Sequence, residues 1–311
     1  MSNYEILLYY KYTHISDPDE FCDKQKLLCE KLGLKGRIII TEEGINGTVE
    51  GLKENTQKYI DETVKDSRFA DMNFKRSEGT GNAFPKLSVK SRTEIVSAHL
   101  GEDDINPNVI TGKYLPAEEL HKWIHSDKEF YIVDMRNDYE HSVGFFKDSI
   151  LPPLKHFRDL PKILPGLAHL KDKTVVTVCT GGVRCEKASG FLVKHGFKDV
   201  YQLHNGIVSY MEKYPNEDFL GKLYVFDGRV TMAFNNPDKP AEVVGKCKKC
   251  GSSSENFVNC MQPSCHDHFI CCENCLSRKK EAFCNWKCAF VKKLRDNFSI
   301  FKHSVKHKVS L

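Results

Sequence analysis

Apolar and polar residues follow two different rhythms in the first hundred positions of the chain. Three short apolar runs, rich in aromatic and β-branched residues, lie close to turns that carry glycine, which predicts strands. Two other segments have the apolar spacing of amphipathic helices, and a last strand-like segment follows them. The order β-α-β-β-α-β predicts a ferredoxin-like (acylphosphatase-like) α+β domain over residues 1–98. The predicted strands lie within 4–12, 35–51 and 85–98, and the predicted helices within 17–34 and 52–66.

The pattern changes between residues 112 and 216, where short and continuously apolar strands alternate with helices. Such strands are typical of an α/β domain with a parallel sheet and helices on both faces. The polar segment 99–115, which contains glycine and proline, is the predicted boundary between the two domains. The predicted strands lie within 129–136, 174–178 and 199–203, and the predicted helices within 116–124, 185–197 and 207–214.

The third block, residues 240–311, is rich in cysteine and then basic. Nine of the 13 cysteines lie between Cys247 and Cys288. In a reducing compartment such a number indicates metal binding or catalysis rather than a disulfide framework. A block of this size also has too few apolar residues to fold around a core of its own without additional stabilisation, such as bound metal ions.

The cysteines of this block form four close pairs, which is how zinc ligands are usually delivered to a tetrahedral site. We predict two structural zinc sites, in which the first pair joins the third and the second joins the fourth; sequential pairing is the alternative. Cys271 is the spare thiol, and His266 or His268 are substitute ligands. The four pairs are Cys247 and Cys250, Cys260 and Cys265, Cys272 and Cys275, and Cys284 and Cys288.

Charge and targeting signals narrow the class of protein. The chain has no run of 18 apolar residues and its first residues do not resemble a signal peptide, so we expect a cytoplasmic protein that does not span a membrane. The net charge is +4, but residues 241–311 hold 13 basic and 6 acidic residues. A basic tail is compatible with a polyanionic partner or with a solubilising role. The sequence leaves the oligomeric state open.

The segment VTVCTGGVRCEKASGF (176–191) has the strongest chemical signal. Cys179 follows a buried strand, and the carboxyl ends of parallel strands are where ligands bind in such sheets. Gly181 and Gly182 allow consecutive N–H groups to point into one concavity, and Arg184 adds a positive charge. The following helix, which we expect Cys185 to open, contributes its positive end. Such a cradle stabilises a thiolate and predicts a reactive cysteine.

Residues 174–191, together with IVDMRNDYEHSVGFF (132–146), resemble a rhodanese domain, whose thiol carries a persulfide. Asp134, Arg136, Glu140 and Gly144 match the rhodanese-type pattern, although Phe145 replaces the usual histidine and Asn205 a common glycine. In such domains Asp134 commonly supports loops rather than taking part in the chemistry. Position favours Cys179 as the reactive thiol, whereas Cys185 is also a candidate, and the two are alternatively an attacking and a resolving pair.

Nearly the whole chain is similar to the tRNA uridine hydroxylase (TrhO/YceA) family. The resemblance rests on five segments and on the cysteine-rich tail. It implies an oxidoreductase of the monooxygenase type that uses molecular oxygen to convert the wobble uridine-34 of tRNA to 5-hydroxyuridine, with a persulfide often assigned to Cys185. The segments are YYKYTHI (9–15), EGING (43–47), VDMRNDYE (133–140), CTGGVRCEKAS (179–189) and GKLYVFDGR (221–229).

The RNA contacts are predicted from basic and aromatic residues, since phosphates need charge and an unstacked base needs an aromatic surface. Alternation on a strand places Lys86, Lys90 and Arg92 on one side. The full set also contains the loop residues Gly181 and Gly182, Lys187 on the next helix, Tyr10, Lys11 and His14 near the N-terminus, and Lys292, Lys293 and Arg295 in the tail.

Two other functions stay open from the sequence. A sulfurtransferase that carries a persulfide from thiosulfate or a protein donor would use the same loop, and a non-catalytic zinc adaptor would use only the tail. The chain has no flavin, nicotinamide or iron-triad motif, so the residues themselves predict an activated thiol and not the hydroxylation.

Overall fold

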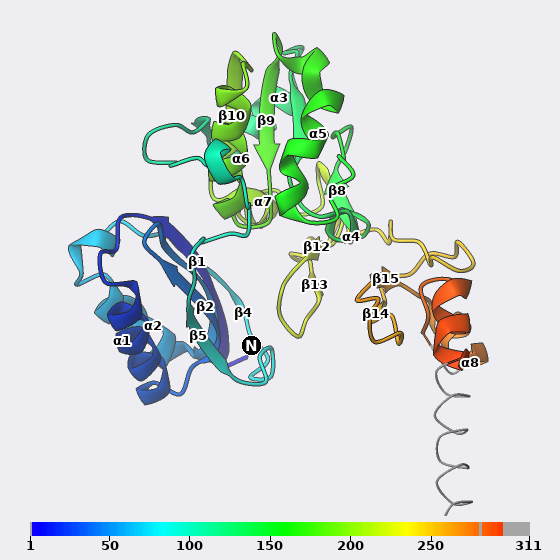
Figure 1. The fold of residues 1–311 in the computed structure, drawn as a ribbon, viewed down its shortest axis with the longest axis horizontal. Coiled ribbons are helices and arrows are strands. Elements are labelled where there is room, and N and C mark those ends of the chain that lie inside the picture. The colour runs from blue at the N-terminus through cyan, green and yellow to red at the C-terminus, as the bar shows by residue number, and fades with distance from the viewer. Residues whose placement is uncertain (1, 280–281, 295–311) are drawn as a thin grey trace, which may run out of the picture.

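A five-stranded sheet in the order β4-β1-β3-β2-β5 forms the N-terminal domain of the computed structural model, which describes residues 2–279 and 282–294. The first four strands are antiparallel neighbours with α1 and α2 packed on one face, which confirms the ferredoxin-like prediction, and β5 runs parallel to β2 (Figure 1). The elements are β1 (Tyr4–Tyr12), α1 (Pro18–Lys31), β2 (Lys35–Thr41), β3 (Gly44–Leu52), α2 (Lys53–Thr63), η1 (Ser67–Phe69), β4 (Phe74–Glu78) and β5 (Leu87–Ser91).

The order of the last two strands differs from the expectation. The strand predicted within 85–98 is β5, which is an additional strand at the edge of the sheet. The fourth strand of the ferredoxin-like order is β4, which was not predicted from the apolar pattern. β4 has the sequence FKRSE and pairs only with β1, so it lies at the edge of the sheet. Edge strands often carry charge, which removes the apolar alternation that identifies a buried strand.

The two faces of this sheet have different partners. One face carries Leu7, Tyr9 and Ile38, which are buried beneath the helices. The other face carries Leu8 and Tyr10, whose positions alternate with those residues, and it turns toward the second domain. The N-terminal domain therefore presents an open sheet face to the rest of the molecule.

The second domain has a four-stranded parallel sheet in the order β6-β10-β9-β7. Apolar residues of α3 and α7 fill the core on one face and those of α5 and α6 the core on the other, which confirms the predicted architecture. Its elements are η2 (Gly101–Asp103), β6 (Lys113–Leu115), α3 (Ala117–Ile124), β7 (Tyr131–Asp134), α4 (Asp138–His141), β8 (Gly144–Phe146), η3 (Phe157–Asp159), α5 (Leu160–Leu167), η4 (Ala168–Leu170), β9 (Thr174–Val178), α6 (Val183–Lys194), β10 (Asp199–Leu203) and α7 (Gly206–Lys213).

The segment that links the two domains is part of the second one. Leu100 and Ile105 are buried in the core beside α6, although the segment is polar in sequence. A Cβ on Gly190 of α6 would lie 2.7 Å from the Ile105 side chain, which shows how closely the segment packs. This packing restricts the position of the N-terminal domain relative to the second domain.

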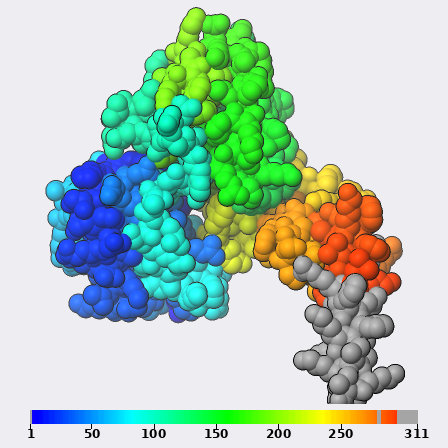
Figure 2. Space-filling view, viewed as in Figure 1, coloured from blue at the N-terminus to red at the C-terminus, as the bar shows by residue number. Residues whose placement is uncertain are grey.

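The strands β14 (Phe257–Asn259) and β15 (His268–Ile270) and the helix α8 (Glu273–Lys279) form a small third part that projects from the side of the molecule (Figures 1 and 2). Its core consists largely of cysteines with Phe269, Ala282 and Phe283. Within the described residues, no helix is both long and apolar enough to cross a membrane. Three short strands precede this part: β11 (Phe219–Gly221), which pairs with β8, and β12 (Leu223–Tyr224) and β13 (Thr231–Met232), which pair with each other. Phe219 and Leu223 are buried in the core of the second domain.

Candidate active site

Residues 179–184, here called the reactive loop, follow the carboxyl end of β9 and include the first two residues of α6. Gly182 precedes α6 with a φ of +104°, and a Cβ there would lie 2.7 Å from the Tyr10 hydroxyl oxygen. Only glycine satisfies both conditions without strain. The helix therefore begins at Val183, and Cys185 lies within its first turn rather than opening it as expected.

The first residues of α7 form backbone hydrogen bonds with the reactive loop. The N–H groups of Ile207 and Val208 donate to the carbonyl oxygens of Cys179 and Thr180 at 2.9 and 3.0 Å. A Cβ on Gly206 would lie 2.6 Å from the loop backbone, so only glycine permits this approach. With two carbonyl groups turned toward α7, N–H groups of the loop are left to face the sulfur of Cys179.

The Cys179 thiol is fully buried, and its surroundings favour the thiolate. Burial acts to raise its pKa, but this effect is outweighed by the Cys185 thiol, the Arg184 charge and the N–H groups of Cys185 and Gly182. The resulting pKa lies well below the ordinary value of a thiol. A lowered pKa at the end of a parallel strand is the electrostatic signature of a reactive cysteine.

Cys185 has the opposite electrostatic state. Burial and the neighbouring Cys179 thiolate raise its pKa well above the ordinary value. It therefore remains a neutral thiol that donates a hydrogen bond to the sulfur of Cys179. The two thiols thus have different electrostatic states, and only Cys179 has the lowered pKa that favours a thiolate.

Arg184 is held by a buried ion pair with Glu140. Its two terminal nitrogens donate to the two carboxylate oxygens at 2.6 and 2.8 Å, and Glu140 is completely buried. Burial acts to lower the pKa of Arg184, but Glu140 raises it above its ordinary value, so the side chain stays charged. A bidentate pair fixes the guanidinium in one orientation beside the loop.

Asp134 lies in a second buried ion pair, outside the thiol's immediate contacts. It binds Arg136 through hydrogen bonds of 2.6 to 3.1 Å, and Arg136 donates onward to the Gly144 carbonyl oxygen at 2.7 Å. Both side chains are fully buried. These contacts connect the ends of β7 and β8 and correspond to the supporting role that the sequence favoured for Asp134.

Tyrosines of the N-terminal domain contact α6 directly. The Tyr10 hydroxyl donates to Glu186 at 3.0 Å, and the Tyr12 hydroxyl donates to the Val183 carbonyl oxygen at 3.2 Å. Glu186 is buried and also accepts from Tyr114 at 3.0 Å. These contacts seat the open sheet face against the reactive loop.

Lys187 is not placed as an RNA contact. Its side chain is fully buried, and its ammonium binds Glu43 of the N-terminal domain and Asp104 of the linking segment, the latter at 2.9 Å. It is an internal ion-pair partner that joins the domains. The amphipathic pattern of a helix does not reveal such a partner, because Glu43 is 144 residues away in sequence.

A cavity of about 550 Å³ lies between the reactive loop and the open sheet face. Cys179, Gly181 and Arg184 line it from the loop, so the cavity adjoins the residue with the lowered thiol pKa. The opposite wall and the rim contain aromatic, amide and cationic side chains. These include Tyr10, Arg37, Asn46, Asn137, His156, Arg158 and Phe226.

The predicted basic strand lies beside this cavity. Lys90 of β5 is paired in register with Ile39, which lines the cavity, so the two side chains share the open sheet face. Lys86, Lys90 and Arg92 are all exposed. They therefore extend the open face outward from the cavity.

The other predicted RNA contacts are scattered. Lys11 forms an exposed ion pair with Asp71 at 2.6 Å, and His14 lines a separate small cavity. Lys293 is exposed near the end of the described chain, Lys292 is partly buried, and Arg295 lies outside the described residues.

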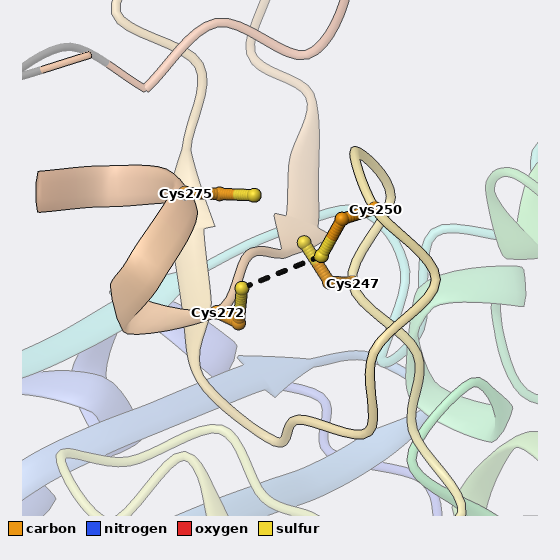
Figure 3. Close-up of side chains that lie close together, drawn as sticks. All are labelled: Cys247, Cys250, Cys272 and Cys275. Carbon is orange, nitrogen blue, oxygen red and sulfur yellow. Dashed lines mark hydrogen bonds between the residues drawn. The ribbon is translucent and has the colours of Figure 1, made fainter. Parts of the chain in front are cut away.

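The cysteines of the third part form two groups of four, paired as the sequence predicted. Within each group the sulfurs lie within 4.8 Å of one another, and those of Figure 3 point toward one another. Three separations between sulfurs, 3.6, 3.5 and 3.5 Å, are close to the roughly 3.8 Å edge expected for four thiolates at 2.3 Å from a tetrahedral zinc. The groups are Cys247, Cys250, Cys272 and Cys275, and Cys260, Cys265, Cys284 and Cys288.

Cys271 and His268, which the sequence left as additional possible ligands, lie outside both cysteine groups. Cys271 is buried in the small core. His268 bonds Tyr224 at 3.2 Å and Asn259 at 2.8 Å, so its two ring nitrogens already have protein partners. Each group thus has four thiolates available and could hold a metal ion without a histidine.

Comparison with known proteins gives the family. Three sequence profiles match in succession: the UPF0176 acylphosphatase-like domain over residues 4–95, the rhodanese-like domain over 116–213 and the rhodanase C-terminal domain over 220–289. The chain is 44% identical to a tRNA uridine(34) hydroxylase of Cytophaga hutchinsonii over 93% of its length and 90% of that protein. The chain belongs to the tRNA uridine(34) hydroxylase family.

Two further members have the same relationship. The chain is 46% identical to the hydroxylase of Bacillus licheniformis over 88% of its length and 84% of that protein. It is 42% identical to that of Staphylococcus saprophyticus over 97% of its length and 94% of that protein. Family membership identifies the chain as an oxidoreductase.

Several site residues were present in the family segments without an assigned role. Glu43 and Asn46 belong to EGING, Asn137 and Glu140 to VDMRNDYE, and Phe226 to GKLYVFDGR. The structure brings these distant segments to the reactive loop or its cavity. Their presence in the family segments was the only indication that these residues belong to the site. No single segment showed which other residues they contact.

Proposed function

We propose that this chain hydroxylates uridine 34 of tRNA at C5, with molecular oxygen as co-substrate and Cys179 as the reactive thiol. One observation carries the proposal: a buried cysteine with a lowered pKa borders a cavity between the rhodanese-type loop and an open sheet face. A base inserted into this cavity would lie next to Cys179, although the sulfur itself is buried in the structure. The type of reaction is inferred from the relatives, which are tRNA uridine(34) hydroxylases.

The cavity suits a nucleoside that has been turned out of its stack. Its volume lies in the range of small-ligand pockets, and it is lined by the two chemical types that such a base needs. Tyr10 and Phe226 offer aromatic surfaces for stacking, and Asn46 and Asn137 offer amides for the polar edge of uracil. We assign these four residues to the uridine, with Cys179 directed at its C5 atom.

The basic residues around the cavity suit the RNA backbone. Arg37 and Arg158 lie on its wall, and Lys86, Lys90 and Arg92 continue along the open face. Phosphate contacts require charge but little geometric precision, so exposed lysines and arginines serve this purpose. A tRNA substrate is also the reason to place the protein in the cytoplasm.

The two cysteine groups hold structural zinc ions in this proposal. Four thiolates suit zinc, and a site with four protein ligands has no open position for catalysis. Each ion joins segments that are distant in sequence around a very small apolar core. Zinc would therefore supply the folding free energy of the third part and take no part in the chemistry.

The test is nucleoside mass spectrometry of total tRNA from cells that lack the gene and are complemented with variants. Wild type and Cys22→Ser, which changes a buried cysteine of the N-terminal core, should restore 5-hydroxyuridine derivatives. Cys179→Ser should not restore them. Cys185→Ser should retain part of the activity, because a serine hydroxyl still donates to the neighbouring sulfur.

The same experiment separates the alternative function. If the derivatives persist in the deletion strain without a redundant enzyme, or return with Cys179→Ser, the proposal is wrong. A sulfurtransferase would instead acquire cyanide-reactive sulfur from thiosulfate at a high rate in the absence of RNA. The same loop geometry permits that reaction, so this measurement on purified protein accompanies the first.

A further inference from the structure

A cluster of two histidines and one aspartate lies apart from the reactive loop. His121 and His125 are one turn apart at the end of α3, and Asp218 directly precedes β11. Their ligand atoms lie within 4.8 Å of one another. We propose that His121, His125 and Asp218 form a third metal site, which binds a divalent transition-metal ion through nitrogen and oxygen ligands.

The distances in the cluster fit such an ion. The Nδ1 atom of His121 is 3.1 Å from Oδ2 of Asp218, and Nε2 of His125 is 3.4 Å from Oδ1. Ligands at 2.0–2.1 Å from a tetrahedral ion are about 3.3 Å from one another. The observed separations are therefore close to those between ligands around a tetrahedral ion.

The surrounding contacts orient two of the ligands. Nδ1 of His125 lies 2.8 Å from the His121 carbonyl oxygen, to which it donates, so Nε2 carries the free lone pair. The Tyr210 hydroxyl donates to Asp218 and holds its carboxylate. Partners of this kind, which bind the far side of a ligand, are typical of metal sites.

The His121 ring is also fixed. It stacks on Tyr214 with ring centroids 3.9 Å apart and an interplanar angle of 4°. Its Nδ1 lies 3.1 Å from Oδ2 of Asp218, and a bound ion would take the place of the hydrogen bond between them. Glu217, whose Oε2 lies 3.8 Å from Nε2 of His121, adds negative charge beside the cluster.

The cluster is distinct from both the thiol site and the cysteine groups. α7 begins beneath the reactive loop and runs away from it, so the segment between α7 and β11 lies at the opposite end of the sheet. The cluster faces solvent, since the His125 side chain is 53% exposed. With three protein ligands and an open position, this site should exchange its ion more readily than a site of four buried thiolates.

A bound ion would join α3 to the segment that follows α7. Imidazole and carboxylate ligands suit Zn²⁺, Co²⁺ and Ni²⁺, whereas thiolates are absent from the cluster. The expected consequence is stabilisation of this end of the second domain when the ion is present, and no effect on the orientation of the reactive loop.

The experiment is a Co²⁺ titration of the full-length protein with its cysteine groups filled with zinc. Wild type should bind one further equivalent with weak visible ligand-field bands and without the intense thiolate-to-cobalt absorption of a cysteine site. It should also melt at a higher temperature with Co²⁺. His99→Gln, which changes another exposed histidine, is the matched control and should behave as wild type.

Two variants decide the result. His125→Gln and Asp218→Asn should each weaken binding of the further equivalent at least tenfold and abolish the thermal shift. His125→Gln removes an exposed side chain, so it should remain folded even if Asp218→Asn does not. Absence of a further equivalent in wild type, or binding that is unchanged in His125→Gln, would overturn the proposal. Neither outcome bears on the hydroxylase function, whose residues lie elsewhere.

Discussion

The charge of Arg184 controls the pKa of Cys179, and two substitutions should move that pKa in opposite directions. Arg184→Met removes the positive charge that favours the thiolate, so the pKa should rise. Glu140→Gln keeps Arg184 but removes the negative charge that partly neutralises it, so the pKa should fall. A general loss of structure would not move the pKa of Cys179 in opposite directions in the two variants, so this result would identify an electrostatic effect.

The magnitude follows from the contacts of the pair. The wild-type pKa of Cys179 is lowered to about 6. An opposite charge in close contact typically changes a pKa by about one to three units, and Arg184 is one of several groups that favour this thiolate. We therefore expect a midpoint about one to two pH units higher in Arg184→Met, and a smaller decrease in Glu140→Gln.

Both variants should also lose stability. Removing one partner of a buried ion pair costs about 3–5 kcal/mol, and Glu140 is completely buried. Glutamine retains a hydrogen-bond acceptor, so Glu140→Gln should lie toward the lower end. Chemical denaturation measures this cost and shows whether each variant is folded at the temperature of the titration.

The assay is a pH titration by NMR of protein labelled with ¹³C at the cysteine Cβ atoms. The Cβ shift reports thiolate formation without requiring a reagent to reach a buried sulfur, and Cys179→Ala assigns the signal. Midpoints that stay equal in all three proteins, or that move in the same direction in both variants, would refute the electrostatic account of the reactive loop.

Three further predictions test other parts of the structure. Cys272→Ser should reduce the zinc content from two ions to one per chain, whereas the neighbouring Cys271→Ser should keep both; metal analysis after gel filtration checks this. Lys90→Gln should weaken tRNA binding and lower its salt dependence by about 0.7–0.9 in log–log slope. Lys58→Gln, which changes an exposed lysine of α2 on the other side of the sheet, should do neither; filter binding at several salt concentrations measures both. Gly206→Ala, at a φ of +73° and with its Cβ against the loop backbone, should cost about 1–3 kcal/mol and most of the activity; denaturation and nucleoside analysis test this.

Much of the fold was accessible from the sequence because its elements have strong local patterns. The apolar runs of β1, β2, β7, β9 and β10 identify buried strands, and close cysteine pairs identify the metal-binding groups. β4 was missed because an edge strand is mostly polar. The start of α6 was misplaced by two residues because Gly182, through its positive φ, ends the loop earlier than the cysteine suggested.

The candidate site was only partly accessible. The reactive loop has a local signature, but the cavity beside Cys179 is built from residues of both domains. Lys187 shows the limit most clearly: its charge suggested an RNA contact, whereas Glu43 and Asp104 enclose it between the domains. Whether a charged side chain faces solvent or a buried partner depends on contacts between distant segments, which no local pattern records.

The two thiols of the reactive loop are best understood as one electrostatic unit. A buried thiolate needs hydrogen-bond donors, and two thiolates in contact would repel each other. Cys185, whose pKa is raised by burial and by its neighbour, keeps its proton and supplies a donor to Cys179. Arg184 supplies the charge, and Glu140 keeps that charge in place. Gly181 and Gly182 carry no side chain because backbone N–H groups complete the cradle, and because Leu8 and Tyr10 pack where their Cβ atoms would otherwise lie.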